Sequence, residues 1–275
     1  MLLVFDHIKH MNKPLTHRPR KRFGQNFLHD PGVISRIVST INPQPGDRLV
    51  EIGPGKGAIT LPLLQAAGRL QVIELDRDLV EPLQERCRDI GDLEVINADA
   101  LKTDFCGLSH GETLRVVGNL PYNISTPLLF HLLAQSSCIR DMHFMLQKEV
   151  VDRLAAAPGS GRYGRLSVMV QFRCAVTPLF GIGPGAFQPA PRVESAFVRL
   201  QPWRDPPVRV RDEAMLGRVV QQAFGQRRKT LRNALKGLLD EAQIRSLGID
   251  PTARAEVLEI ADFARLADLA SGEAA

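Results

Sequence analysis

Glu51-Ile52-Gly53-Pro54-Gly55-Lys56-Gly57 is the stretch that decides the fold. It directly follows an apolar run, residues 48–52, that we expect to be a strand, and it leads into a helix predicted from about Ala58. Glycines at such a junction permit a tight turn and let a ligand approach the backbone closely. A strand, a glycine-rich turn and a helix in this order are typical of the ligand-binding edge of an α/β sheet.

The spacing of these glycines narrows the class of ligand. They follow G-x-G-x-G, rather than the G-x-G-x-x-G of dinucleotide-binding folds, and no P-loop ending in Lys-Ser or Lys-Thr is present. A phosphate cradle is therefore disfavoured. The acidic residue ahead of the loop, Glu51, suits a ligand with a cationic amino-acid part and no phosphate, and S-adenosylmethionine fits that description.

Acidic residues follow the next two predicted strands. Glu74 comes after residues 70–73, at a distance from the glycines that lets a carboxylate accept hydrogen bonds from both ribose hydroxyls, with Asp76 as its rival. Asp99 falls just past the third strand, residues 93–97, where it can take the amino group of an adenine. Each acid alone is equally consistent with a helix cap or a surface charge. Their succession at strand ends favours a shared binding site.

The whole chain divides into an α/β part and a helical part. Further strands are predicted at 114–118 and 142–146, a helix at 127–134 and a last strand at 193–200. Strand and helix alternation predicts a mostly parallel α/β sheet with helices on both faces. Together with the S-adenosylmethionine site inferred from the loop, this predicts a Rossmann-like methyltransferase sheet. Prolines 202, 206 and 207 end this pattern, and helical periodicity follows from about Asp212. We expect a basic extension at 1–20, the methyltransferase domain at 21–201 and a small all-helical domain at 202–275.

Asn119-Leu120-Pro121-Tyr122, after the fourth strand, suits the activation of an amine. An exocyclic adenine amine is a poor nucleophile because its lone pair is delocalised into the ring. The amide oxygen of Asn119 and the carbonyl of Leu120 can accept both amine hydrogens and direct the lone pair toward a methyl group. Tyr122 offers a flat face for an extruded base. An ordinary turn after a strand is the alternative interpretation of the motif alone.

A second aromatic residue lies on a proline-stiffened loop. Phe187 begins the segment Phe187-Gln188-Pro189-Ala190-Pro191-Arg192-Val193 and is a candidate for closing the other side of the base. A single phenylalanine is more commonly part of a hydrophobic core.

Composition bounds the class of protein. The 275 residues are 44% hydrophobic and 24% charged, and no apolar run approaches the roughly 20 residues of a spanning helix. The first five residues are apolar, but Asp6 and the basic residues after it do not fit an export signal, and Met11 is an alternative start. We therefore expect a cytoplasmic protein with no membrane partner.

The cysteines and the basic residues lead to two further expectations. Cys87, Cys106, Cys138 and Cys174 form no C-x-x-C pair, so we predict buried, reduced thiols and no metal site. The net charge of +5 suggests a polyanionic partner. The charge is concentrated in two clusters, Lys13, Arg18, Arg20, Lys21 and Arg22 near the start, and Arg227, Arg228, Lys229, Arg232 and Lys236 near the end. Within the second cluster, Arg227, Arg228, Lys229 and Arg232 fall within about one and a half helical turns, which predicts one broad basic face.

These residues together resemble a known family, the small-subunit ribosomal RNA adenine dimethyltransferases, whose relatives methylate large-subunit RNA and confer macrolide resistance. The resemblance runs from about Arg20 to near the end. It rests on the following segments: Arg22-Phe23-Gly24-Gln25-Asn26-Phe27-Leu28, the 51–57 loop, Glu74-Leu75-Asp76, the segment 119–125, Gln147-Lys148-Glu149-Val150, the segment 187–193, and Arg227-Arg228-Lys229-Thr230-Leu231-Arg232-Asn233. The last of these is typical of the small-subunit branch.

The resemblance implies roles for particular residues. Cofactor contacts are implied for Asn26, Leu28, Gly53, Gly55, Glu74, Asp99 and Asn119, and RNA contacts for Arg22, Arg227, Arg228, Lys229 and Arg232. The implied substrate is a pair of adjacent adenosines in a hairpin loop near the 3′ end of 16S rRNA, each dimethylated during small-subunit biogenesis by a monomeric enzyme. Two alternatives are a DNA amino-methyltransferase, disfavoured by the short helical tail, and a non-catalytic ribosome-assembly factor, disfavoured because the glycines and Asn119 are present.

Overall fold

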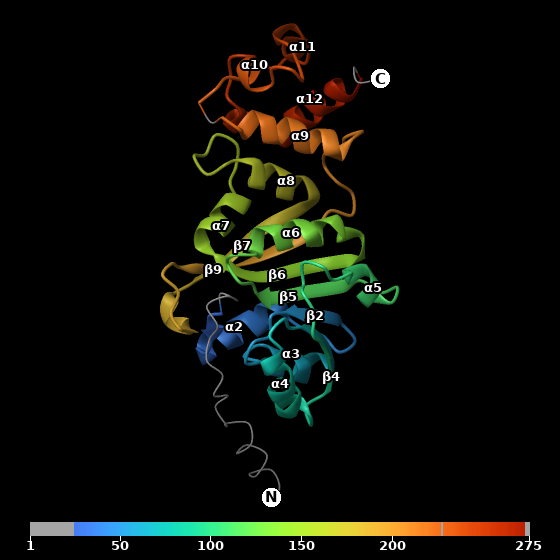
Figure 1. Cartoon of the computed structure of the whole chain (residues 1–275), viewed down its shortest axis with the longest axis vertical. Helices are drawn as coiled ribbons and strands as arrows, with labels where there is room; N and C mark the ends of the chain where they lie inside the picture. The colour runs from blue at the N-terminus through green and yellow to red at the C-terminus, as the bar shows by residue number, and fades with distance from the viewer. Residues whose placement is uncertain (1–24, 227, 273–275) are drawn as a thin grey trace, which may run out of the picture. The chain divides into compact units, whose positions relative to one another are not determined.

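The main sheet of the protein has seven strands in the order β4-β3-β2-β5-β6-β9-β7 (Figure 1). The computed structural model describes residues 25–226 and 228–272. The strands are β2 (Arg48–Ile52), β3 (Arg69–Ile73), β4 (Asp92–Ile96), β5 (Leu114–Asn119), β6 (Ile139–Gln147), β7 (Cys174–Ile182) and β9 (Ser195–Pro202). Strands β2 to β6 pair in parallel, and β9 runs antiparallel to β6. The predicted Rossmann-like α/β sheet is confirmed.

Helices cover this sheet. They are α2 (Pro31–Ile41), α3 (Thr60–Ala67), η2 (Arg77–Leu79), α4 (Val80–Cys87), α5 (Phe105–Ser109), α6 (Ser125–Ala134), η3 (Ser136–Cys138) and η4 (Pro184–Ala186). Helices α2, α3 and α4 bury Ile37, Leu63 and Leu83 in one cluster with Val72 and Val117 of the sheet. Each such side chain contributes about 1.5–3 kcal/mol to the free energy of unfolding when it is fully buried. This packing therefore holds the strand ends in a fixed arrangement.

The bounds of α2 follow from its sequence. Asp30 caps the first turn, since its Oδ1 accepts a hydrogen bond of 2.9 Å from the Val33 amide, and Pro31 supplies a fixed φ at the first helical position. The helix ends at Asn42, which adopts the left-handed conformation with φ 49°. Arg115 of β5 donates at 2.7 Å to the buried carbonyl of Ile41 in the last turn, so the helix end is tied to the sheet.

A buried ion network surrounds Arg115. Its Nη1 donates to Asp47 at 2.7 Å and its Nε to Asp141 at 3.1 Å, while Arg140 bonds the other oxygen of Asp47 at 2.9 Å. Arg115 is 6% exposed, so removing one partner would leave a buried charge uncompensated. The network lies at the end of the sheet opposite the strand ends that carry the candidate acids, because Arg115 is near the start of β5.

The chain separates into two compact units. The first contains the described residues up to Lys148 together with Pro178–Leu200, and the second contains Glu149–Thr177 and Gln201 onward. The predicted start of the helical domain at residue 202 lies one residue from Gln201. The structure adds Glu149–Thr177 to the helical unit, because Val168 and Phe172 share a core with the C-terminal helices.

The second unit is predominantly helical. It contains α7 (Lys148–Leu154) from Glu149 on, α8 (Arg165–Arg173), α9 (Glu213–Phe224), α10 (Leu231–Ala234), α11 (Glu241–Ser246), η5 (Ala255–Val257) and α12 (Ile260–Gly272). Its core joins Leu216 and Val220 of α9 to Phe263 and Leu266 of α12. Residues 166–183 form a largely apolar stretch for which the sequence pattern assigned no element, and in the structure they contain most of helix α8 followed by strand β7.

The prediction that all four cysteines are reduced thiols is wrong. Cys106 in α5 and Cys138 in η3 form a disulfide, with Cα atoms 5.4 Å apart. Gln135 supports the same arrangement, since its Oε1 accepts a hydrogen bond of 2.7 Å from the Phe105 amide. Thirty-two residues separate the two cysteines along the chain, and no local spacing revealed their proximity. Cys87 and Cys174 are buried and free, as predicted.

Candidate functional site: a cavity at the carboxyl ends of the strands

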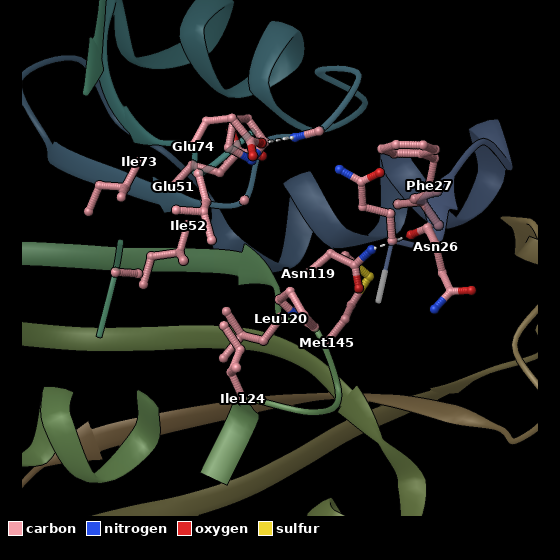
Figure 2. Close-up of a pocket in the computed structure, with 18 of the residues that line it drawn as sticks. Asn26, Phe27, Glu51, Ile52, Ile73, Glu74, Asn119, Leu120, Ile124 and Met145 are labelled. Carbon is pink, nitrogen blue, oxygen red and sulfur yellow. Dashed lines mark hydrogen bonds between the residues drawn. The ribbon is translucent and has the colours of Figure 1, made fainter. Parts of the chain in front are cut away.

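A cavity of about 300 Å³ lies where β2, β3 and β5 end (Figure 2). Ligands of open α/β sheets bind at this edge. Nine of the predicted site residues line it: Asn26, Leu28, Gly53, Gly55, Glu74, Asp99, Asn119, Leu120 and Tyr122. Asn26 and Tyr122 are 96 residues apart in the chain, so segments distant in sequence converge here. Neighbouring lining residues that sequence reasoning left unassigned include Lys56, Ile59, Ile124 and Met145.

The glycine loop requires glycine for two separate reasons. Gly53 and Gly55 have φ of 67° and 57°, values that other residues adopt only with strain. A Cβ on Gly55 would also lie 3.0 Å from Cδ1 of Phe27, whose ring covers the loop. The ammonium of Lys56 in turn lies 4.9 Å from the centre of the Phe27 ring. Because Gly53 and Gly55 have no side chains, the backbone of the loop lies close to the cavity.

Glu74 is the acid that faces the cavity after β3. Its Oε2 accepts a hydrogen bond of 3.2 Å from the Gly55 amide, and its Oε1 accepts one of 2.8 Å from the Asp76 amide. Burial raises the pKa of Glu74, and these amide bonds oppose that effect. The rival acid, Asp76, caps η2 through the Asp78 amide and is not among the described residues that line the cavity. The structure therefore places Glu74 rather than Asp76 at the cavity, a choice that the sequence left open.

Glu51 is the most deeply buried acid of the cavity. It is 1% exposed, and within the described part of the chain its Oε2 has no hydrogen-bond partner. Desolvation raises the pKa of Glu51 to about 8, with a further contribution from the charge of Glu74 and an opposing one from the Thr60 hydroxyl. An orphaned buried carboxyl beside a second acid favours a cationic ligand, because a positive charge would stabilise both carboxylates.

Asp99 lies on the loop after β4, between Ala98 and Ala100, which also line the cavity. Its Oδ1 accepts a hydrogen bond of 3.0 Å from the Leu101 amide, which fixes the carboxylate at the head of the loop. The loop carbonyl of Asp99 accepts a further bond from Thr103 at 3.1 Å. The Asp99 carboxylate is fixed by its own loop, and the neighbouring Ala98 and Ala100 have small side chains. This arrangement suits a ligand with a flat ring that carries an amino group.

The amide of Asn119 has a defined orientation. Its Nδ2 donates to the backbone carbonyl of Asn26 at 2.9 Å (Figure 2). A carbonyl only accepts hydrogen bonds, so the nitrogen must face Asn26 and the Oδ1 must lie on the other side of the amide. The next residue is fixed as well, because the Leu120 amide donates to the Met145 carbonyl at 3.2 Å.

Tyr122 is held at both ends. Its hydroxyl lies 2.5 Å from the Ser195 hydroxyl, and its carbonyl accepts a bond of 3.2 Å from Ser125. Burial raises the pKa of Tyr122, so the phenol stays neutral. Ser195 was not predicted as a site residue, because it belongs to no recognised motif. The sequence signal that could have found it was its position two residues after the segment 187–193.

Phe187 is not brought to the cavity. It forms β8 (Phe187–Gln188), which pairs with β1 (Phe27–Leu28) so that Phe187 lies opposite Leu28. Its side chain is 2% exposed and belongs to the core cluster, and Phe187 is outside the set of described residues lining the cavity. The position observed is therefore the core position that a single phenylalanine commonly occupies, and it gives no support to a stacking role.

The second basic cluster does not form one helical face. Arg22 and Arg227 lie outside the described residues, Arg228 and Lys229 lie in the connection between α9 and α10, and Arg232 lies in α10. Helix α9 ends at Phe224 and the next helix, α10, begins at Leu231, so the expected continuous helical face is broken. Arg232 forms an ion pair of 3.4 Å with Glu241.

A groove in the second unit gathers other polar groups beside Lys229. Its lining is cationic or carboxamide-bearing, with Gly225 and Ala234 as the exceptions: Arg218, Gln221, Gln222, Gln226, Lys229, Asn233 and Lys236. Among the described residues that line it, none is acidic. Arg218 was not assigned from sequence, and Lys236 was named only as a member of the second basic cluster, since their proximity depends on the packing of α9 against α10.

Two other kinds of site are absent from the described parts of the chain. No helix there is long and apolar enough to cross a membrane. In the same residues, no three His, Cys, Asp or Glu side chains are grouped as ligands of a metal ion.

Comparison with known proteins gives consistent matches. The model of the family described as ribosomal RNA adenine dimethylase matches residues 16–271. Proteins named ribosomal RNA small subunit methyltransferase A are similar over most of the chain. The one from Nitrosococcus oceani is 60% identical across 92% of this chain and 96% of the relative, and the one from Pseudomonas putida is 57% identical across 94% and 97%.

Solved structures agree with these matches. A dimethyladenosine transferase from Plasmodium falciparum superimposes with a TM-score of 0.77 at 26% identity, covering 87% of this chain and 95% of the other. The 23S rRNA methyltransferase ErmE gives 0.70 at 25% identity, covering 90% and 100%. Family model, sequence relatives and fold all lead to one conclusion: the chain belongs to the ribosomal RNA adenine dimethylase family.

Proposed function

We propose that this enzyme transfers methyl groups from S-adenosylmethionine to the N6 amines of two adjacent adenosines, in a hairpin loop near the 3′ end of 16S rRNA, during small-subunit biogenesis. The orientation of Asn119 carries the proposal. With its nitrogen bound to the Asn26 carbonyl, Asn119 presents an acceptor rather than a donor to an incoming group. The relatives named as small-subunit methyltransferases support the choice of RNA.

The chemistry depends on two acceptors and one ring. Oδ1 of Asn119 and the carbonyl of Leu120 accept the two hydrogens of the amine, which turns its lone pair away from the purine ring. Tyr122 stacks on the base and fixes its plane. No strong general base is needed, because the nitrogen loses a proton readily after it has attacked. Placement and polarisation account for most of the rate enhancement.

The cavity fits the methyl donor on the basis of its buried acids. When bound, S-adenosylmethionine supplies an electrophilic methyl on a positively charged sulfur. Glu74 would accept hydrogen bonds from the ribose hydroxyls, Asp99 would bind the adenine amine, and the orphaned Glu51 would face the cationic part. Asn26, Leu28, Gly53 and Gly55 would contact the ligand through the covering strand and the loop.

RNA binding is proposed for Arg228 and Lys229 together with the groove that contains Lys229. Cationic side chains neutralise phosphates without reading sequence, and carboxamides can bond either phosphate or ribose. Arg22, Arg227 and Arg232 remain predicted RNA contacts. Lys236→Glu should weaken RNA binding strongly at low salt and reduce the slope of log K against log salt by about 1. Arg209→Glu, which changes an exposed cation outside this groove, is the matched control; equal effects would remove the groove from the interface.

One experiment tests the reaction itself. Small-subunit particles lacking the modification, naked RNA and DNA are each incubated with labelled S-adenosylmethionine, and the methylated nucleoside is identified after digestion. We expect N6-dimethyladenosine from the particles, and Asn119→Ala should abolish it while the fold stays intact. Transfer to DNA alone, or no transfer to any substrate, would contradict the proposal.

A further inference from the structure

The hydroxyl of Tyr122 calls for an explanation that stacking does not provide. A base stacks on an aromatic ring alone, and phenylalanine offers the same flat face. The phenol is also a poor acid or base here, since burial raises the pKa of Tyr122 further above neutrality. The function of the hydroxyl must therefore lie in what it contacts, which is Ser195 at 2.5 Å.

Ser195 is placed for this contact by the sheet. It is the first residue of β9 and pairs with Gln147, the last residue of β6, so it lies at the carboxyl edge where β5 and β6 end. Its side chain is completely buried, whereas Tyr122 is half-buried at the cavity. A buried hydroxyl without a partner costs about 1–3 kcal/mol, so each of the two hydroxyls strongly favours the other's observed position.

The opposite end of Tyr122 is fixed in a similar way. Ser125, which is 1% exposed, donates to the Tyr122 carbonyl at 3.2 Å. With the main chain held by Ser125 and the ring tip held through Ser195, the two side-chain torsions of Tyr122 have little freedom. An immobile ring lowers the ordering cost when a base binds, and it sets the angle at which the amine meets Asn119.

We propose that Ser195 is a positioning residue for methyl transfer, which acts on the target base through the hydroxyl of Tyr122. The proposal rests on the proposed stacking role of Tyr122 and extends it to a residue on another strand. The segment 187–193, whose Phe187 is buried in the core, precedes the strand that carries Ser195.

The test compares Ser195→Ala, Tyr122→Phe and the double variant, with Tyr122→Ala as reference. Turnover of target RNA at saturating S-adenosylmethionine, the dissociation constant of S-adenosylmethionine and the thermal midpoint are measured for each. We expect Ser195→Ala and Tyr122→Phe each to lower kcat on RNA roughly tenfold, the effect of one lost hydrogen bond. The double variant should lose no more than either single one, and cofactor affinity should stay within about twofold, since both residues act through one contact.

The outcomes separate this proposal from the one on which it rests. Losses that multiply in the double variant, or a parallel loss of cofactor affinity, would overturn the positioning role. Full activity of Ser195→Ala with an inactive Tyr122→Ala would reject Ser195 and retain stacking, whereas full activity of Tyr122→Ala would reject stacking itself. If Ser195→Ala does not fold, Tyr122→Phe breaks the same contact and leaves Ser195 in place, and its unchanged kcat would reject the proposal.

Discussion

In the cofactor-free enzyme, the free energy of unfolding should fall as pH rises, and replacing Glu51 by glutamine should remove this fall. The folded state raises the pKa of this carboxyl from 4.5 to about 8, chiefly through desolvation. The folded protein therefore binds the proton more tightly than the unfolded chain does, and stability falls as pH rises through this window. At about 1.36 kcal/mol per pH unit, the complete loss is about 5 kcal/mol, an upper bound because an ionised carboxylate draws in water.

The assay is the pH dependence of unfolding for wild type and Glu51→Gln between pH 5 and pH 9. The two proteins should be similarly stable near pH 5, where Glu51 is protonated, and the variant should become more stable by several kcal/mol toward pH 9. For a domain of this size, each kcal/mol raises the thermal midpoint by about 2–4 °C. Glu81→Gln, at an exposed glutamate of α4, is the control and should follow wild type.

Cofactor binding gives a second measurement of the same carboxyl. A cationic ligand favours the ionised form of Glu51, so binding near pH 7 should release protons. Calorimetry in buffers of different ionisation enthalpy measures that release, and the difference between wild type and Glu51→Gln isolates the contribution of this residue. Parallel stability curves for the two proteins, together with equal proton release, would refute the reasoning.

Three other predictions concern the loop and the ion network. Gly55→Ala should weaken S-adenosylmethionine binding by at least about tenfold in calorimetry, because the backbone there is left-handed and the new Cβ would meet the Phe27 ring. Gly46→Ala is the control, since Gly46 also has a positive φ but, beyond its chain neighbours, no described residue lies within 4 Å of its Cβ position. Equal weakening by both variants would reject the steric argument. Arg115→Met should cost about 3–5 kcal/mol in urea unfolding, since it removes the buried cation that pairs with both Asp47 and Asp141; a cost below 1 kcal/mol would contradict this. Burial alone would raise the pKa of Asp141, but the contacts with His143 and Arg115 lower this pKa to about 2. The free energy of unfolding should therefore fall as pH drops from about 3.8 toward 2, and Asp141→Asn should lack that decline.

The sequence predicts this fold well where its patterns are local. The strand positions agree to within a few residues, because each parallel strand is a short apolar run bounded by turn residues. Residues 166–183 were beyond that method, since a buried helix and a buried strand are both apolar runs. The non-helical connection between α9 and α10, which holds Arg228 and Lys229, was missed for a different reason: charge density says nothing about where a helix ends.

The candidate site shows the same division at finer scale. Glu74 and Asp99 were predictable because parallel strands bring their carboxyl ends to one edge. The groups that orient the chemistry come from distant parts of the chain: the Asn26 carbonyl that turns the Asn119 amide is 93 residues away, and Ser195 is 73 residues from Tyr122. An Asn-Leu-Pro-Tyr turn without these partners would leave its amide free to present either a donor or an acceptor. Selectivity for an amine therefore depends on long-range packing, and a variant that loosens β1 or β9 should reduce methyl transfer even when all four residues of the motif are intact.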